Sequence, residues 1–269
     1  MYPRLFTIGP FSLPTYGALV ALAFLLGLHL AGKLARRSGL PADHVTNMGV
    51  HIALAAILGA KLFLILSHAD YYFADPKRLF TVEALQAGGV FYGGLLAALG
   101  VAYYYVKRHG LPWLRTADVF APAAAAGHAV GRLGCFAAGC CWGRPTDEPW
   151  GVVFSDPRAH EFTGVPLGVH LHPTQLYESF GTALVALFLY RRFLRPHADG
   201  VILGWYLILY SSFRFVVEFF RDDAARPMVL GSDTLSATQW VAMGLIVAGC
   251  ALLLRNRHRA PAPAAAQPR

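Results

Sequence analysis

Three short stretches place ionisable side chains inside or beside strongly apolar runs. The first contains His128 and Arg132, four residues apart, a spacing that brings two side chains onto one face of a helix. Ionisable groups in hydrocarbon are unfavourable, by about 3 kcal/mol each on insertion scales, and usually line a functional interior. The other two stretches contain His172, Gln175, Tyr177 and Glu178, and then Tyr210, Arg214, Glu218 and Arg221.

The arginines of these stretches could together bind an anion. Arg132, Arg214 and Arg221 stay charged at physiological pH, and a guanidinium group binds phosphate oxygens through a bidentate fork. The alternative is structural, because an arginine can pair with Glu178 or Glu218 and hold two helices together. For a single arginine the sequence does not decide between these uses. The whole set, with tyrosine, histidine and glycine nearby, favours a phosphate site.

The rest of the sequence is that of a membrane protein. Of 269 residues 56% are hydrophobic and only 14% are charged, where a soluble domain carries about a quarter charged residues. A spanning helix needs about 20 mostly apolar residues. An all-α integral membrane protein with about seven transmembrane helices is therefore predicted, with a polar excursion at 140–173 that includes a short strand or interfacial segment at 150–154. The predicted spans are 16–32, 50–66, 88–106, 117–130, 179–190, 201–219 and 238–254.

The net charge of +8 could suggest nucleic-acid binding, but its distribution argues against this class. Lysine and arginine are concentrated in the loops after the first, third, fifth and last apolar runs. Basic residues favour the cytoplasmic side of a membrane and attract its anionic lipids. We therefore expect an N-terminus outside and a C-terminus in the cytoplasm. Residues 1–255 are expected to form one polytopic domain, and 256–269 a disordered cytoplasmic tail.

Four cysteines need a separate interpretation. Cys135, Cys140 and Cys141 have a spacing that is not a usual zinc pattern, so no metal site is predicted. Packing of small residues beside glycines is favoured, and a disulfide or redox role on the oxidising side is the alternative. Cys250 lies in the last apolar run and is most simply a small buried hydrophobic residue.

Six motifs follow one another along nearly the whole chain: FTIGPFSLPTYG (6–17), ADP (74–76), GGVFYGG (88–94), GRLGCFAAGCCWGR (131–144), HPTQLYE (172–178) and YSSFRFVVEFFR (210–221). In this combination the sequence resembles the prolipoprotein diacylglyceryl transferase family. The resemblance implies a multi-pass enzyme of the bacterial inner membrane that needs no cofactor. Its partners would be phosphatidylglycerol, other membrane lipids and prolipoprotein signal peptides that bear a lipobox cysteine.

The implied reaction moves the diacylglyceryl group of phosphatidylglycerol onto the lipobox thiol, the first step of lipoprotein maturation, and releases glycerol phosphate. By motif position, Arg132 and Arg214 match the family's essential arginines and would act on the phosphate. Lys61 stands where a basic residue is usual. The residues expected to bind substrate are Arg132, Tyr16, Lys61, Gly93, Gly94, His172, Gln175, Tyr177, Glu178, Tyr210, Glu218 and Arg221.

The sequence departs from the family pattern at three positions. Tyr92 stands where many members have histidine, Cys135 where they have asparagine, and Cys140 at a glutamate position. A mechanism that needs that histidine as proton acceptor is therefore in doubt. His128 is the expected replacement, with His172 or Glu178 behind it, while Tyr92, Tyr16 and Tyr210 are candidate hydrogen-bond partners of lipid oxygens.

Two other classes of protein remain as alternatives. The cysteine cluster would suit a membrane thiol-redox protein. The buried arginine, histidine and glutamate residues would suit an ion- or proton-coupled transporter. A transporter predicts interrupted helices at matching positions in two halves, and the sequence has no such repeat.

Overall fold

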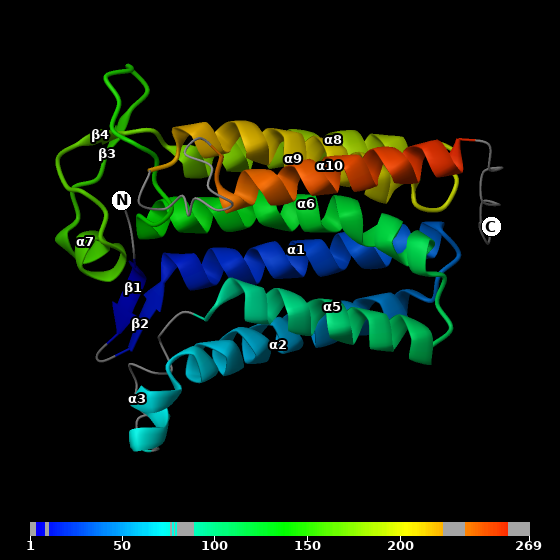
Figure 1. Ribbon diagram of the computed structural model, residues 1–269, viewed down its shortest axis with the longest axis horizontal. Coiled ribbons are helices and arrows are strands. Elements are labelled where there is room, and N and C mark those ends of the chain that lie inside the picture. The colour runs from blue at the N-terminus through cyan, green and yellow to red at the C-terminus, as the bar shows by residue number, and fades with distance from the viewer. Residues whose placement is uncertain are drawn as a thin grey trace.

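The computed structural model describes residues 4–8, 11–75, 77, 79, 89–222 and 235–257, in which long helices lie side by side (Figure 1). Contacts join α1 to α2 and α6, α2 to α5, α8 to α6 and α9, and α9 to α6 and α10. In Figure 1, α2 and α5 lie on one side of α1, and α8, α9 and α10 lie on the other. The long helices are α1 (Thr15–Arg37), α2 (Ala42–Ser67), α5 (Phe91–Arg108), α6 (Trp113–Ala138), α8 (Thr174–Phe193), α9 (Val201–Val217) and α10 (Ala237–Asn256).

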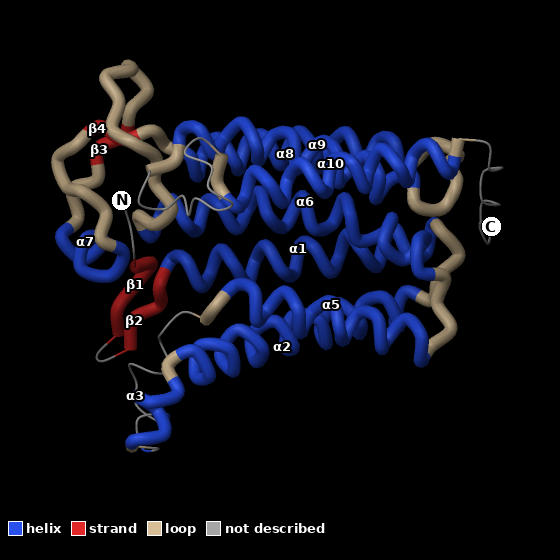
Figure 2. The backbone as a smooth tube through the Cα atoms, viewed as in Figure 1, coloured by secondary structure: helices blue, strands red, loops and turns tan. Residues whose placement is uncertain are grey.

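The short elements gather at the end of the bundle where α1 begins (Figure 2). The strands form two antiparallel pairs, β1 with β2 and β3 with β4. The β3–β4 pair confirms the strand interpretation of 150–154, whereas the hairpin before α1 was not predicted. These elements are β1 (Arg4–Ile8), β2 (Phe11–Pro14), α3 (Ala69–Ala74), β3 (Val152–Val153), α7 (Pro157–Thr163) and β4 (His170–Leu171).

Four helices within the described residues are long and apolar enough to cross a membrane: α1, α2, α10, and α9 together with the 3₁₀ turn η2 (Glu218–Phe220). The helices that contain the predicted fourth and fifth spans are longer than those apolar runs, because α6 continues to Ala138 and α8 begins at Thr174, and neither is among the four. Their missing ends carry polar residues that are buried between helices, which hydropathy alone does not recognise. Residue 88, where the third predicted span starts, and the predicted tail from residue 258 lie outside the described residues.

Small side chains let α6 approach its neighbours closely. Ala121, Ala123 and Ala125 are buried and share one core cluster with Leu189 of α8 and Ile202 of α9. Close backbone approach at small residues is a common way for helices to associate in membranes. The C-terminal third of α6, which carries the sequence-predicted site, is therefore held between α1, α8 and α9.

One buried carboxylate in α6 has a structural explanation. Asp118 is 1% exposed, and its two oxygens accept hydrogen bonds from the backbone N–H groups of Gly200 and Leu203, at 2.6 and 2.7 Å. These donors begin α9 and have no partner within that helix. Asp118 thus caps α9 from a neighbouring helix and fixes the two helices relative to each other.

We expect Asp118→Ala to lower the free energy of unfolding by about 2 kcal/mol, because two buried donors lose their acceptor. Thermal unfolding in detergent, followed by circular dichroism, measures this effect. Asp43→Ala is the matched control, since Asp43 lies exposed in the first turn of α2. Equal melting temperatures for the two variants would contradict the capping role.

Candidate active site

The centre of the site is an ion pair between α6 and α8. Arg132 Nη2 lies 2.6 Å from Glu178 Oε2, and the Glu178 side chain is only 1% exposed. His128 shares the helical face of Arg132, as its spacing predicts. Its Nε2 lies 3.2 Å from Arg132 Nε and 3.4 Å from Glu178 Oε2. Both contacts cannot be hydrogen bonds at once, because Nε2 either accepts from the arginine or donates to the carboxylate.

A second ion pair lies at the end of α9. Arg214 Nη1 is 2.6 Å from Glu218 Oε2, and Ser236 Oγ donates a hydrogen bond of 2.7 Å to Glu218 Oε1. Arg221 links the two pairs, with its Nη1 4.0 Å from Glu178 and its Nε 4.0 Å from Glu218. The three predicted arginines therefore do converge, and each also has a carboxylate neighbour.

The charges in this cluster do not cancel. Among the ion pairs of the described residues, three guanidinium groups meet two carboxylates, which leaves one positive charge in excess. The arginine side chains are only 12–16% exposed. Arg221 Nε is buried and has no hydrogen-bond partner within the described part of the chain. Buried charge normally requires compensation, so the cluster is suited to an additional anion.

Backbone contacts hold the loop after α6 against the end of α9. Gly143 and Arg221 form an isolated antiparallel bridge, and Arg144 N donates to Phe220 O at 3.0 Å. A Cβ at Gly143 would meet His172 O at 2.8 Å and would also collide with Phe220 O, so only glycine allows this approach. Arg221 is thereby brought beside α6, although it belongs to a distant part of the chain.

An apolar cavity of about 400 Å³ leads to the same place from the outside of the bundle. It lies between α1, α2 and α6, and its inner wall includes His128 and Gly131. Val20 and Phe24 also line it and are 39% and 37% exposed, so the cavity reaches the outer surface of the helices. Its size is in the range of small-molecule sites, about 300–1,000 Å³. An apolar chain could enter here while a polar group remained at the arginines.

Two residues of the HPTQLYE motif, His172 and Gln175, make hydrogen bonds to different parts of the structure. His172 is buried, and its Nδ1 lies 3.0 Å from Tyr177 Oη. Burial, and then the charge of Arg144, lowers the pKa of His172 below its ordinary value of 6.5. At neutral pH it is therefore uncharged and can accept the tyrosine hydrogen bond. Gln175, which is fully buried, instead donates from Nε2 to Cys140 O at 2.7 Å.

Comparison with known proteins decides the family. The model of the family described as prolipoprotein diacylglyceryl transferase matches residues 3–255. The chain belongs to this family. A relative from Clostridium tetani (strain Massachusetts / E88) is 33% identical over 260 residues, covering 96% of this chain and 99% of that protein. One from Vibrio vulnificus (strain CMCP6) is 35% identical over 256 residues, covering 93% and 90%.

A third relative, from Ruegeria pomeroyi (strain ATCC 700808 / DSM 15171 / DSS-3), is 35% identical and covers 95% of each chain. All three relatives are named phosphatidylglycerol–prolipoprotein diacylglyceryl transferase. The resemblance of the six motifs is thus confirmed, and this protein is a transferase. Membership of the diacylglyceryl transferase family does not support the two alternatives, a thiol-redox protein and a transporter.

Within this diacylglyceryl transferase, the structure brings some predicted residues together and not others. The Tyr210 ring lies 5.4 Å from the His128 ring, and Tyr16 faces α6 at Gly134, whose Cβ would be 3.3 Å from it. Tyr92 is instead 58% exposed on α5, where its ring contacts Phe91. Lys61, Gly93 and Gly94 also belong to the α2–α5 pair, across α1 from α8 and α9 (Figure 1).

The glycines of the GGVFYGG motif have a packing explanation. A Cβ at Gly93 would collide with Phe63 Cβ and lie 2.7 Å from Gly59 O, and a Cβ at Gly94 would lie 2.8 Å from Ala56 O. The two helices therefore touch through backbone at this point. Gly93 and Gly94 serve α2–α5 packing, and no contact given by the structure links them to the arginines.

We expect Gly93→Ala to lower the free energy of unfolding by about 1–3 kcal/mol, because the added methyl group meets backbone that cannot yield. Gly100→Ala in the same helix is the control, since nothing lies within 4 Å of its Cβ. That change should stabilise slightly, by up to about 1 kcal/mol, through helix propensity. If Gly93→Ala melts no lower than Gly100→Ala, the packing explanation is wrong.

The sequence missed several contributors to the site. Ser236 donates to Glu218 and also caps α10 together with Gln239, a capping box that the Ser-x-x-Gln spacing could have revealed. Ser179 Oγ binds Ala129 O at 2.8 Å and ties α8 to α6. The interpretation of Cys250 as buried was wrong, because it is exposed on α10.

Proposed function

We propose that this protein transfers the diacylglyceryl group of phosphatidylglycerol to the lipobox cysteine of prolipoproteins, in the bacterial inner membrane. The names of its relatives support the donor and the acceptor. The single observation that supports a location for the active site is the buried arginine cluster with its excess positive charge. A phosphodiester carries one negative charge and would balance it.

The membrane arrangement proposed is one polytopic domain with seven spans, the N-terminus outside and the C-terminus in the cytoplasm. Five of the long helices carry basic residues in their last turn, and four of them, all but α9 with Arg214, end opposite the short strands (Figure 1). Basic helix ends favour the cytoplasmic side. The site, at the other end, would then face the outer leaflet. The basic residues are Arg36, Arg37, Lys107, Arg108, Arg191, Arg192 and Arg255.

Three changes make up the reaction. The lipobox sulfur forms a bond to the glyceryl carbon, the bond from that carbon to the phosphate oxygen breaks, and the thiol proton leaves. The phosphate gains one negative charge as it departs. Arg132 and Arg214 stabilise this charge from largely buried positions, and Arg221, which lies 4.0 Å from both carboxylates, adds a third cation. The apolar cavity holds an acyl chain and so aligns the carbon with the sulfur.

His128 is the candidate proton acceptor. It borders the cavity, and Glu178 lies beside its Nε2. Arg132 occupies the same nitrogen, so His128 acts as a base only when substrate draws Arg132 away toward the phosphate. Tyr92 is at the α2–α5 pair, and His172 is engaged with Tyr177. His128 is therefore better placed than either of them.

The test is transfer by purified protein in detergent. A lipobox peptide and phosphatidylglycerol should yield a peptide heavier by one diacylglyceryl group, together with glycerol phosphate, by mass spectrometry. The same peptide with Cys→Ser should give no product, and phosphatidylethanolamine tests the headgroup. Absence of product from the cysteine peptide, with folded protein and either lipid, would refute the proposed function.

A further inference from the structure

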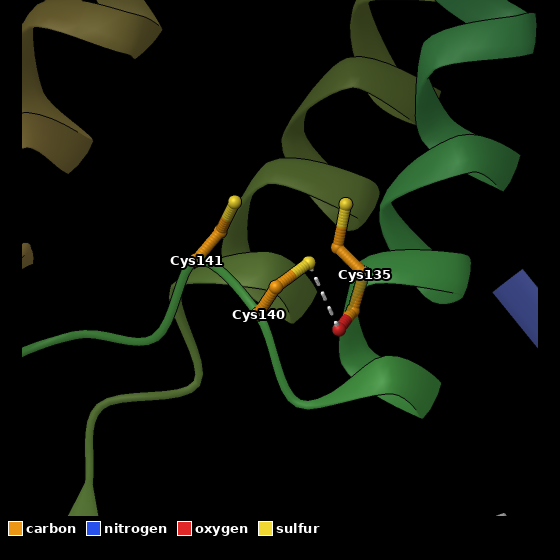
Figure 3. Close-up of side chains that lie close together, drawn as sticks. All are labelled: Cys135, Cys140 and Cys141. Atoms are coloured by element: carbon orange, nitrogen blue, oxygen red, sulfur yellow. Dashed lines mark hydrogen bonds between the residues drawn. The ribbon is translucent and has the colours of Figure 1, made fainter. Parts of the chain in front are cut away.

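Three thiols converge at the C-terminal end of α6 and in the loop that follows it (Figure 3). Cys135, Cys140 and Cys141 are free, partly exposed, and have their Sγ atoms within 4.8 Å of one another. Cys140 lies between the other two in the close-up, and its Sγ is 3.7 Å from Cys135 O. The group of potential ligand atoms consists of sulfur alone.

The backbone is shaped to produce this convergence. Gly139 ends α6 with φ of +77°, and Cys141 follows with φ of +61°, a region that residues other than glycine rarely adopt. Unusual backbone of this kind persists where the surroundings enforce it and is common at functional sites. Here Gln175 Nε2 binds Cys140 O and Thr174 Oγ1 binds Cys141 O, both at 2.7 Å.

These two anchors, Thr174 and Gln175, are fully buried at the start of α8. They fix the loop before any ligand binds, and preorganised ligands are what a metal site requires. The spacing in the sequence did not predict a metal site. The left-handed conformations of Gly139 and Cys141 fold the chain back, so that the cysteines five and six positions after Cys135 meet it.

The thiols also lie next to the chemistry. Cys135 follows Arg132 by three residues in α6, one turn along the helix. Cys141 precedes Gly143, which is bridged to Arg221.

Resting on the proposed function, we propose that Cys135, Cys140 and Cys141 form a three-thiolate site for Zn²⁺ whose open fourth position takes the lipobox thiol of the prolipoprotein. Thiolates select soft ions, and three protein ligands with one open position are the usual arrangement of catalytic zinc. Tetrahedral Zn–S bonds of about 2.3 Å require sulfurs about 3.8 Å apart. The observed trio therefore needs to contract by only about 1 Å.

The metal would activate the lipobox thiol in this protein, which has Tyr92 where many family members have a histidine. A thiol that coordinates Zn²⁺ is deprotonated, and His128 or water takes the proton. The bound sulfur keeps a lone pair, which forms the bond to the glyceryl carbon. The electron pair of the broken carbon–oxygen bond leaves with the glycerol phosphate. The thioether product is a weaker ligand than a thiolate, so it leaves and the site is ready for the next peptide.

The experiment measures metal binding and transfer separately. Purified full-length protein, reduced and freed of metal by a chelator, is titrated with Zn²⁺ and with Co²⁺, whose absorption reports thiolate coordination. We expect one equivalent to bind with sulfur-to-cobalt charge transfer, and Cys140→Ser or Cys141→Ser to weaken binding at least about tenfold. Cys250→Ser on α10 is the matched control and should bind like the parent protein.

Substrate readouts complete the test. A lipobox peptide should increase the cobalt–thiolate absorption, and the Cys→Ser peptide should not. Transfer should fall about 100-fold on metal removal and return with Zn²⁺. Metal-free protein that is fully active, a trio that forms a disulfide in place of binding metal, or a cobalt spectrum unaffected by the peptide would overturn the proposal. Zinc binding with no transfer under any condition would instead refute the proposed function.

Discussion

Arg132→Ala is expected to reduce transfer by about 1,000-fold, because it removes a preorganised donor from the departing phosphate. It also leaves Glu178 buried without its closest cation, which lies 2.6 Å away. Arg132→Lys should recover only part of the activity, since an ammonium group keeps the charge but loses the bidentate fork. The turnover of lipobox peptide by purified protein measures both effects.

Arg115→Ala is the control for Arg132→Ala. Arg115 also pairs with a carboxylate, Asp199 at 3.0 Å, but this pair is about 30% exposed and joins the first turn of α6 to the loop before α9, at the opposite end of α6 from Arg132. Exposed pairs contribute about 0–1 kcal/mol, so this variant should remain active and stable. Equal activity of the Arg132 and Arg115 variants would remove Arg132 from the chemistry.

Glu178→Ala should lower the free energy of unfolding by about 3–5 kcal/mol and abolish transfer. Glu178 is 1% exposed and faces Arg132, Arg221 and His128, so its removal leaves buried cations uncompensated. Chemical denaturation in detergent measures the change. The exposed Glu148 provides the control, since Glu148→Ala should change neither property.

The double variant Glu178→Ala/Arg132→Ala tests whether Glu178 stabilises the fold through its charge. If the two residues stabilise the fold mainly as a pair, the double variant should be more stable than the sum of single effects predicts, by about 1–3 kcal/mol. It should nevertheless remain inactive. Strict additivity would show that Glu178 acts through packing and not through the charge of Arg132.

Much of the helical frame could be predicted from apolar runs, because long stretches facing lipid are apolar around most of their surface. The start of α8 could not, since Gln175 and Glu178 are polar by composition yet fully or almost fully buried against other helices. The pairing of β1 with β2 could not be predicted from apolar runs either, because both strands lie before the first such run.

The arginine site was predictable in part. The four-residue spacing of His128 and Arg132 and the stripe ending at Arg221 indicated side chains that the structure places close together. The sequence could not show that two carboxylates face three arginines, because this depends on how α6, α8 and α9 pack. It also could not show that Cys141 adopts a left-handed conformation, which brings its thiol to Cys135.

An experimental structure with phosphatidylglycerol bound tests the central claim most directly. The phosphate is expected among the guanidinium groups of Arg132, Arg214 and Arg221, with one acyl chain in the cavity bordered by Val20 and His128 and with a short arginine–glutamate contact opened. A headgroup bound elsewhere, with Arg132 still on Glu178 and Arg214 still on Glu218, would contradict the claim that these buried charges exist to bind the lipid phosphate.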